Sequence, residues 1–378
     1  MMSSIRPVTI EAIAYRVPIA APIKVSFGTF KDRPMVLVRI VDEDGVEGFG
    51  EIWCNWPAVG AEHRARLAND IGERLIGTTL TTPDQAFSQL TSALEVMVLQ
   101  TGEAGPIASS IAGIDIALWD LSARKQKQPL YRALGGAPRN TLPVYATGIN
   151  PDQPERFAAD RYAEGHRAFK LKTGFDQARD LRNLRAMREA LGNDAVLTCD
   201  ANQALTVEAA IDFARAAAPF DLQWFEEAIR VDAPREHWHA LADASPLPLA
   251  GGENFRGDQF DDAIADRALR VIQPDVTKWG GITGNLHVAR ATVAAGKRYC
   301  PHFFGGGVAL LASLHLLAAA GGSGLLEYDC HPNAGRDLVV GSLLPVSDGH
   351  VPVPEGAGLG ATPYVEALDR YRSWPPRH

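Results

Sequence analysis

Seven ionisable residues recur at nearly regular intervals along the second half of the sequence, each at the end of a short apolar run. The intervals are 22 to 28 residues long, and the residues are Lys172, Asp200, Glu226, Glu253, Asp275, His302 and Glu327. An interval of this length matches one strand–loop–helix–loop unit, and a barrel of such units gathers its strand ends around one mouth. The spacing therefore predicts that these side chains meet at one site, and their types suggest a metal ion flanked by two bases.

Three acids form the centre of the series. Asp200, Glu226 and Glu253 end three consecutive predicted strands, so in a barrel they would be neighbours. Converging carboxylates without a cation would raise each other's pKa, and a divalent ion removes that penalty. A ligand set made only of oxygen favours Mg²⁺, with Mn²⁺ as the alternative, over zinc. The competing interpretation is that each acid pairs with an arginine at the barrel rim.

Candidate bases lie on either side of these acids. Lys170 and Lys172 are two residues apart on one predicted strand, so both point to the same face, which is the interior of a barrel but would be solvent on an edge strand. Two ammonium groups beside a metal ion lower each other's pKa, which leaves one able to act as a base near neutral pH. On the other side, Asp275 next to His302 would fix the tautomer of the imidazole and raise its basicity.

This arrangement suits removal of the proton α to a carboxylate. The product carries two negative charges on one group, and a metal ion, Lys170 and a protonated Glu327 could stabilise that enolate. Reprotonation from the opposite face gives racemisation, whereas loss of a β-hydroxyl group gives dehydration.

The elements that must position these residues alternate after residue 138. Short strands are predicted at 142–149, 168–172, 195–200, 222–226, 247–253, 270–275, 298–302 and 324–327. Helical patterns separate most of them, at 178–191, 207–217, 284–295 and 308–319. Eight such units favour a closed barrel over an open doubly wound sheet.

The first part of the chain follows a different pattern. Strands are predicted at 8–17, 35–41 and 46–51, and helices at 62–76, 83–98 and 106–125. A meander followed by helices is typical of a separate α+β domain. We therefore expect an α+β domain at 1–138, a barrel domain at 139–341, and a C-terminal segment at 342–378 that packs back on the first domain.

Size and composition exclude several classes of function. The chain has 378 residues, more than the roughly 250 of a barrel alone. Its net charge of −8 argues against a nucleic-acid groove. Its four cysteines form no CxxC pair, and no run approaches the roughly 20 apolar residues of a membrane span. We expect a cytoplasmic protein that acts on a small molecule and binds neither nucleic acid nor membrane.

These motifs together resemble the enolase superfamily and, within it, the mandelate racemase group. The resemblance covers nearly the whole chain, and it includes Gly48-Phe49-Gly50-Glu51, residues 112–121 and Lys170-Leu171-Lys172. It implies an α/β fold: a modified (β/α)8 TIM barrel of the (β/α)7β type, with an N-terminal α+β capping domain made of a three-stranded meander and helices. It also implies a Mg²⁺-dependent enzyme that forms a homo-oligomer and acts on a small carboxylate.

The resemblance implies roles for individual residues. Lys172 matches one base and the His302–Asp275 pair matches the other, and Lys170 and Glu327 complete the catalytic set. The metal ligands are matched by Asp200, Glu226 and Glu253. Asn202 matches a polar residue near the substrate. Cap segments 22–34 and 53–60 are expected to be loops that close over the barrel mouth. Phe27, Trp53 and Asn55 are therefore candidate substrate contacts, together with Lys170 and Asn202. The aromatic residues could instead only pack the cap on the barrel.

The expected reaction is dehydration of an acid sugar or related hydroxy acid, because most members that this sequence resembles are hydro-lyases of that kind. Racemisation or epimerisation of a 2-hydroxy acid is the alternative, because Lys172 and His302 could act on opposite faces. A non-catalytic binding module on the same scaffold is a remote third. If the aromatic residues line the cavity, a short or partly apolar acid fits better than a fully hydroxylated sugar acid.

Overall fold

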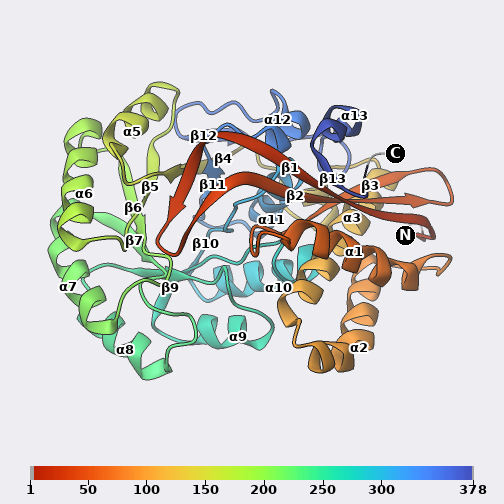
Figure 1. Ribbon diagram of the computed structural model, residues 1–378, viewed down its shortest axis with the longest axis horizontal. Coiled ribbons are helices and arrows are strands. Elements are labelled where there is room, and N and C mark those ends of the chain that lie inside the picture. Colours follow the sequence, from red (N-terminus) through yellow and green to blue (C-terminus); the bar gives the residue numbers. More distant parts are fainter. Residues whose placement is uncertain (1–3, 377–378) are drawn as a thin grey trace.

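The computed structural model describes residues 4–376 and shows a barrel of parallel strands with a cap beside it (Figure 1). In the cap, β1 (Pro7–Val25), β2 (Gly28–Asp42) and β3 (Glu47–Ile52) form an antiparallel meander, and β13 (Arg372–Trp374) joins it along β1. The cap helices are α1 (Gly60–Gly72), α2 (Pro83–Thr101) and α3 (Ala104–Lys125), and the short α4 (Leu130–Ala133) leads to the barrel.

The glycines of the motif at residues 48–51 allow β3 to lie directly against α3. A Cβ atom at Gly50 would lie 1.9 Å from the Gly113 carbonyl oxygen, and one at Gly48 would lie 2.2 Å from the Ala117 carbonyl oxygen. No side chain fits into such a contact, so glycine is required at both positions. This packing buries α3 on nearly all sides, between the meander and the barrel.

Strands and helices alternate through the barrel and confirm the predicted (β/α)7β order. The strands are β4 (Thr141–Ile149), β5 (Ala168–Lys172), β6 (Val196–Asp200), β7 (Leu222–Glu226), β8 (Leu249–Gly251), β9 (Leu269–Ile272), β10 (Arg298–Tyr299) and β11 (Leu326–Asp329). The helices between them are α5 (Pro154–Ala163), α6 (Gln177–Leu191), α7 (Val207–Ala217), α8 (Arg235–Ala244), α9 (Asp258–Ala265), α10 (Gly281–Ala294) and α11 (Gly307–Ala320).

The ring of strands is closed by packing between its two ends. The hydrogen-bonded path runs from β10 through β9 to β4 and then β11. Between β10 and β11 the Leu325 N–H donates to the Cys300 sulfur (3.4 Å), and a Cβ atom at Gly324 would lie 1.8 Å from the Tyr299 carbonyl oxygen. The interior is filled by a buried cluster of Tyr145, Ala168, Trp224, Ala250, Val271, Cys300 and Leu325.

Three site residues lie beyond the strands that were predicted to end with them. β8, β9 and β10 stop at Gly251, Ile272 and Tyr299, so Glu253, Asp275 and His302 belong to the loops that follow. Pro274 and Pro301 have no N–H to continue a ladder, and Gly252 adopts a φ of +132°. Glu327 was also predicted at a strand end, but it is the second residue of β11.

The segment 22–34, expected to be a loop, is instead a β-hairpin. Ile23 pairs with Phe30, Lys24 with Thr29 and Val25 with Gly28, which extends β1 and β2 beyond the meander. The two long strands reach across the barrel in Figure 1. Segment 53–60, by contrast, is irregular until α1 begins at Gly60. The sequence did not predict strands here because the polar and apolar residues of this hairpin do not alternate strictly.

The C-terminal segment contacts both parts of the molecule. After α12 (Ala334–Val340), β12 (His350–Pro352) pairs antiparallel with β4 of the barrel. After α13 (Val365–Leu368), β13 pairs with β1 of the cap. The domain limits at 138 and 341 stay a prediction. Within residues 4–376, the four cysteines are buried and unpaired, and no helix is long and apolar enough to cross a membrane.

Two cap carboxylates hold the first turns of two barrel helices. Glu51 accepts hydrogen bonds from the backbone N–H groups of Gly306 and Ala309 at the start of α11. Asp115 on α3 accepts from the N–H (2.9 Å) and hydroxyl (2.6 Å) of Thr283 at the start of α10. Acidic side chains are favourable at helix N-termini. Burial nevertheless raises the pKa of Glu51 to about 7, and that of Asp115 to about 7.

The raised pKa of Glu51 makes a prediction about pH. Because its carboxyl group binds a proton more tightly in the folded state, it lowers the free energy of unfolding as the pH rises from about 4.5 through about 7. Glu51→Gln removes this titration. Between pH 4.5 and pH 8 the free energy of unfolding of the wild type should fall by on the order of 3 kcal/mol more than that of the variant. Urea unfolding at several pH values measures this difference. The same change at the exposed Glu95 is the control, and parallel curves for Glu51→Gln and wild type would refute the prediction.

Candidate active site

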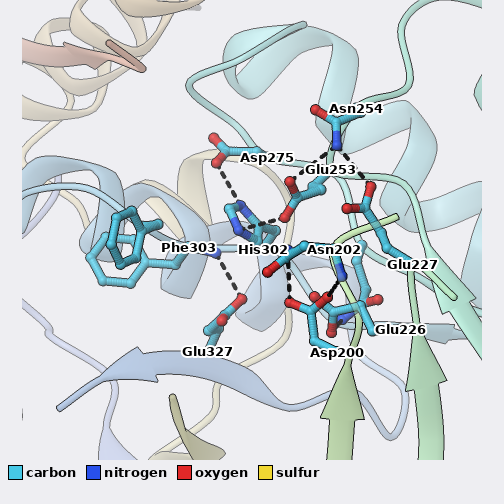
Figure 2. A network of polar contacts seen from close by, with 12 residues as sticks. Asp200, Asn202, Glu226, Glu227, Glu253, Asn254, Asp275, His302, Phe303 and Glu327 are labelled. Atoms are coloured by element: carbon cyan, nitrogen blue, oxygen red, sulfur yellow. Dashed lines mark hydrogen bonds and ion pairs between the residues drawn. The ribbon is translucent and has the colours of Figure 1, made fainter. Parts of the chain in front are cut away.

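The residues of the predicted series meet at the carboxyl ends of the barrel strands, around a cavity of about 480 Å³. Figure 2 shows that the acids of the series and His302 converge on one region. Among all the site residues predicted from the sequence, those that line the cavity are Lys172, Asn202, Glu253, His302 and Glu327 from the barrel, and Phe27, Trp53 and Asn55 from the cap. Lys170, Asp200, Glu226 and Asp275 are buried and do not belong to its lining, so Lys170 is not placed as a direct substrate contact.

Neighbouring strands place the lysines beside the first two acids. Lys172 on β5 is opposite Asp200 on β6, which is opposite Glu226 on β7. The Lys172 ammonium contacts Asp200 Oδ2. Lys170 Nζ lies 2.7 Å from Glu226 Oε1, 2.8 Å from Glu327 Oε1 and 3.7 Å from Asp200 Oδ2. Both lysines therefore point into the barrel, as the sequence predicts, and neither faces solvent.

The pKa of the lysine pair differs from the expectation. Burial lowers the pKa of Lys172, and Lys170 lowers it further. The charges of Asp200 and Glu226 and the hydrogen bond with Asp200 together outweigh both, and the result is a raised pKa. For Lys170, burial is likewise outweighed by Glu226, Glu327 and Asp200. The expected low pKa is therefore not found while Asp200 is ion-paired with Lys172.

His302 bridges two carboxylates. Its Nδ1 lies 2.7 Å from Asp275 Oδ2, and its Nε2 lies 2.7 Å from Glu253 Oε2. Asp275 is itself held through Oδ1 by the N–H (2.8 Å) and hydroxyl (2.6 Å) of Thr277. Burial lowers the pKa of His302, but Glu253, Glu327 and the hydrogen bond with Asp275 raise it to about 10. The two carboxylates therefore hold the imidazole from both sides and favour its protonated form.

Glu327 acts as an acceptor in this structure. Its Oε2 accepts from the Phe303 N–H (3.0 Å) and the Tyr145 hydroxyl (3.1 Å), and its Oε1 contacts the Lys170 ammonium. The predicted role of a protonated Glu327 in stabilising the enolate stays a prediction. In this structure three donors surround the carboxyl group, so its oxygens accept hydrogen bonds.

The donor chemistry of the site fits a hard divalent cation. Within residues 4–376, no three His, Cys, Asp or Glu side chains converge as a ready ligand cluster, and Asp200, Glu226 and Glu253 are instead turned to protein cations. Two further oxygens, Asn202 Oδ1 and Glu227 Oε2, are buried without a hydrogen-bond partner. Buried acceptors without donors are costly, and a cation such as Mg²⁺ would use oxygens of this kind.

Several residues that contact the predicted metal ligands were not found from the sequence. Glu226 Oε2 accepts from Gln273 Nε2 (2.6 Å) and Trp224 Nε1 (3.2 Å). Asn254 Nδ2 donates to Glu227 (2.7 Å), whose pKa is raised to about 8 by burial and by the charges of Glu253 and Asp200. Trp224 could have been found, because it lies two residues before Glu226 and so faces the same way on β7. The others depend on loop conformation.

The cap aromatics both line the cavity and pack the cap on the barrel. Phe30 contacts Trp56 (ring centroids 4.8 Å apart) and also Phe304 of the barrel (5.1 Å). Phe27 at the hairpin turn contacts Trp56 (5.9 Å). Asn55 Nδ2 donates to the Phe304 carbonyl (2.9 Å). The outer part of the cavity is therefore largely aromatic, and the inner part carries the charges and amides.

Comparison with known proteins connects this geometry to one family. The family profile described as mandelate racemase / muconate lactonizing enzyme, N-terminal domain, matches residues 8–135, and the one described as enolase C-terminal domain-like matches residues 154–367. A D-galactarolactone cycloisomerase from Agrobacterium fabrum is 33% identical over 92% of this chain and 93% of its own length.

Solved structures agree with this match. A mandelate racemase/muconate lactonizing enzyme from Bordetella bronchiseptica RB50 is 46% identical, with a TM-score of 0.90 over 98% of this chain and all of its own. A mutant of L-talarate/galactarate dehydratase liganded with Mg and L-glucarate is 27% identical, with a TM-score of 0.86 over 98% of this chain and 93% of its own. These similar proteins are enzymes, and one holds magnesium.

The buried position of Lys170 makes a prediction about stability. Lys170→Met leaves Glu226 and Glu327 buried without their shared cation, and this should lower the free energy of unfolding by about 3–5 kcal/mol. The matched control is Lys24→Met, which breaks a lysine–carboxylate contact with Asp152 of 2.8 Å at the surface and should cost at most about 1 kcal/mol. Urea unfolding followed by circular dichroism measures both. Equal effects would contradict the charge arrangement described above.

Proposed function

Because the chain belongs to the mandelate racemase/muconate lactonizing enzyme family of the enolase superfamily, we propose that it removes the proton α to the carboxylate of a hydroxy acid and then expels a β-hydroxyl group as water. The observation that carries this proposal is the meeting of Lys172 and the His302–Asp275 pair at one cavity. Between them lie Asp200, Glu226 and Glu253, the residues that would hold Mg²⁺. When bound, Mg²⁺ supplies positive charge to the enolate and competes with Lys172 and His302 for Asp200 and Glu253.

Lys172 is the proposed base for the α-proton. It lines the cavity, and its ammonium is repelled by the buried Lys170. A Lys172 side chain released from Asp200 therefore has a lower pKa, as a general base needs. Lys170, held by Glu226 and Glu327, keeps a fixed positive charge next to the place where negative charge develops. Such preorganised charge is a large contribution to catalysis.

His302 is the proposed acid for the leaving hydroxyl group. Its protonated Nε2 points to the cavity side, where Glu253 now accepts, while Asp275 holds Nδ1. Transfer of the Nε2 proton to the β-hydroxyl oxygen releases water, and Asp275 stabilises the imidazole orientation throughout. The aromatic outer part of the cavity favours a substrate that is short or partly apolar at the end remote from its carboxylate.

Racemisation or epimerisation is the second candidate, because the same two groups can serve as bases on opposite faces. Lys172 comes from β5 and His302 from the loop after β10. These strands are separated by four others on one side, β6 to β9, and by two on the other, β4 and β11. In that reaction His302 returns a proton to the α-carbon and no water is lost.

A screen of hydroxy acids and acid sugars with Mg²⁺ in D₂O separates the two reactions. We expect at least one acid to lose water and to form a keto product that contains solvent deuterium. A racemase would instead give α-deuterated acid with its hydroxyl groups intact, as mass spectrometry and proton NMR report. If no acid in the screen lost water or exchanged its α-proton, the proposal would be overturned.

Substitution of Lys172 and His302 assigns their roles. Lys172→Met should abolish exchange of the α-proton, and His302→Asn should retain exchange but slow the loss of water about 10²–10⁴-fold. The control is His287→Asn on α10, whose side chain is 69% exposed and which should keep full activity. Full activity in either Lys172→Met or His302→Asn would remove that residue from the mechanism.

A further inference from the structure

Lys278 is a buried cation that the mechanism above does not use. It lies three residues after Asp275, in the loop between β9 and α10, with a side chain 10% exposed. Its Nζ lies 3.0 Å from Glu253 Oε1 and 3.2 Å from Asn254 Oδ1. The same ammonium lies 4.8 Å from the centroid of the Trp53 ring of the cap. Its three N–H donors therefore have three partners, two on the barrel and one on the cap.

The cap also holds the backbone of this loop. The Trp53 N–H donates to the Thr277 carbonyl (3.2 Å), and the Ser109 hydroxyl on α3 donates to the Lys278 carbonyl (3.2 Å). The loop that carries both Asp275 and Lys278 is thus fixed from the cap side at two neighbouring peptide groups. A displacement of Trp53 would move the loop and the ammonium together.

Glu253 is divided between two directions. Its Oε1 faces Lys278 and Asn254, whereas its Oε2 faces His302 at 2.7 Å. With Oε1 occupied by two donors, the carboxylate cannot rotate without losing them. Partners in this position orient a metal ligand, and their loss typically costs 10–100-fold in metal affinity.

We propose that Lys278 is a positioning residue that orients Glu253 for the metal ion, and that it does so only when the cap places the Trp53 ring against it. This inference rests on the proposed function, because it takes Glu253 as a Mg²⁺ ligand. It makes the cap a part of the metal site, although the cap supplies no ligand. Lys278 also carries a positive charge, which by itself would repel Mg²⁺. If Lys278 acts mainly by orienting Glu253, its replacement should weaken Mg²⁺ binding. If it acts mainly through its charge, its replacement should strengthen Mg²⁺ binding.

Calorimetric titration of the full chain with Mg²⁺ distinguishes these roles. Lys278→Met should weaken binding about 10–100-fold despite the loss of a positive charge, and Lys278→Arg should restore most of the affinity. The control is Lys31→Met, an exposed lysine of the cap hairpin, which should change the affinity by less than about twofold. Unchanged or tighter binding by Lys278→Met would overturn the proposal.

Variants of Trp53 test the cap contact without changing any charge. Trp53→Leu should weaken Mg²⁺ binding several-fold, about 3–10-fold, whereas Trp53→Phe keeps an aromatic face and should bind nearly as the wild type does. If Trp53→Leu and the wild type bound Mg²⁺ with equal affinity, the contribution of the cap would be overturned. This test can be made even if Lys278→Met fails to fold. If the wild type, Lys278→Met and Trp53→Leu all bound Mg²⁺ equally well, only this inference would be refuted. A wild type that binds no Mg²⁺ would refute the proposed function and this inference with it.

Discussion

The balance of charge at the barrel mouth is the constraint on which the rest of the structure depends. Side chains of both signs are packed there with little exposed surface: Asp200, Glu226, Glu253, Asp275 and Glu327 against Lys170, Lys172, Lys278 and His302. Removing one carboxylate or ammonium group from water costs several kcal/mol, so none can be buried alone. Each of these side chains accordingly contacts at least one of opposite charge.

This balance explains why the scaffold must be rigid. The acids come from different strands and loops, so their carboxylates meet only if the strands keep their register and the loops keep their shape. Lys170 is the centre of the arrangement, because it reaches carboxylates on three strands. A barrel with parallel strands and buried interior layers holds such a centre in place.

The cap is part of the same system, although the acids and lysines belong to the barrel. It closes the cavity with aromatic residues, and it holds the first turns of α10 and α11 through Asp115 and Glu51. These helices follow the loops that carry Asp275 and His302. Gly305 leaves room for this contact, because a Cβ atom there would lie 2.7 Å from a Glu51 oxygen. A Cβ atom at Gly306 would lie 2.9 Å from the other Glu51 oxygen and closer still to the Met35 sulfur. The lining of the cavity and the positioning of Asp275 and His302 therefore depend on one interface.

The sequence by itself determined the barrel order and most members of the site. Both depend on local properties: strand–helix periodicity repeats along the chain, and strand ends of a barrel converge wherever the loops run. β5 and β7 match their predicted limits, and the predicted acids, lysines and histidine do meet.

Only the tertiary structure decided the details that depend on atoms from several elements at once. These details include the hairpin at 22–34, the acceptor role of Glu327 and the direction of the Lys172 pKa shift. They also include the place of Lys278 beside Glu253 and Trp53. A pKa or a hydrogen-bond role is the sum of burial and of charges brought from distant positions, and no spacing along one chain contains that sum.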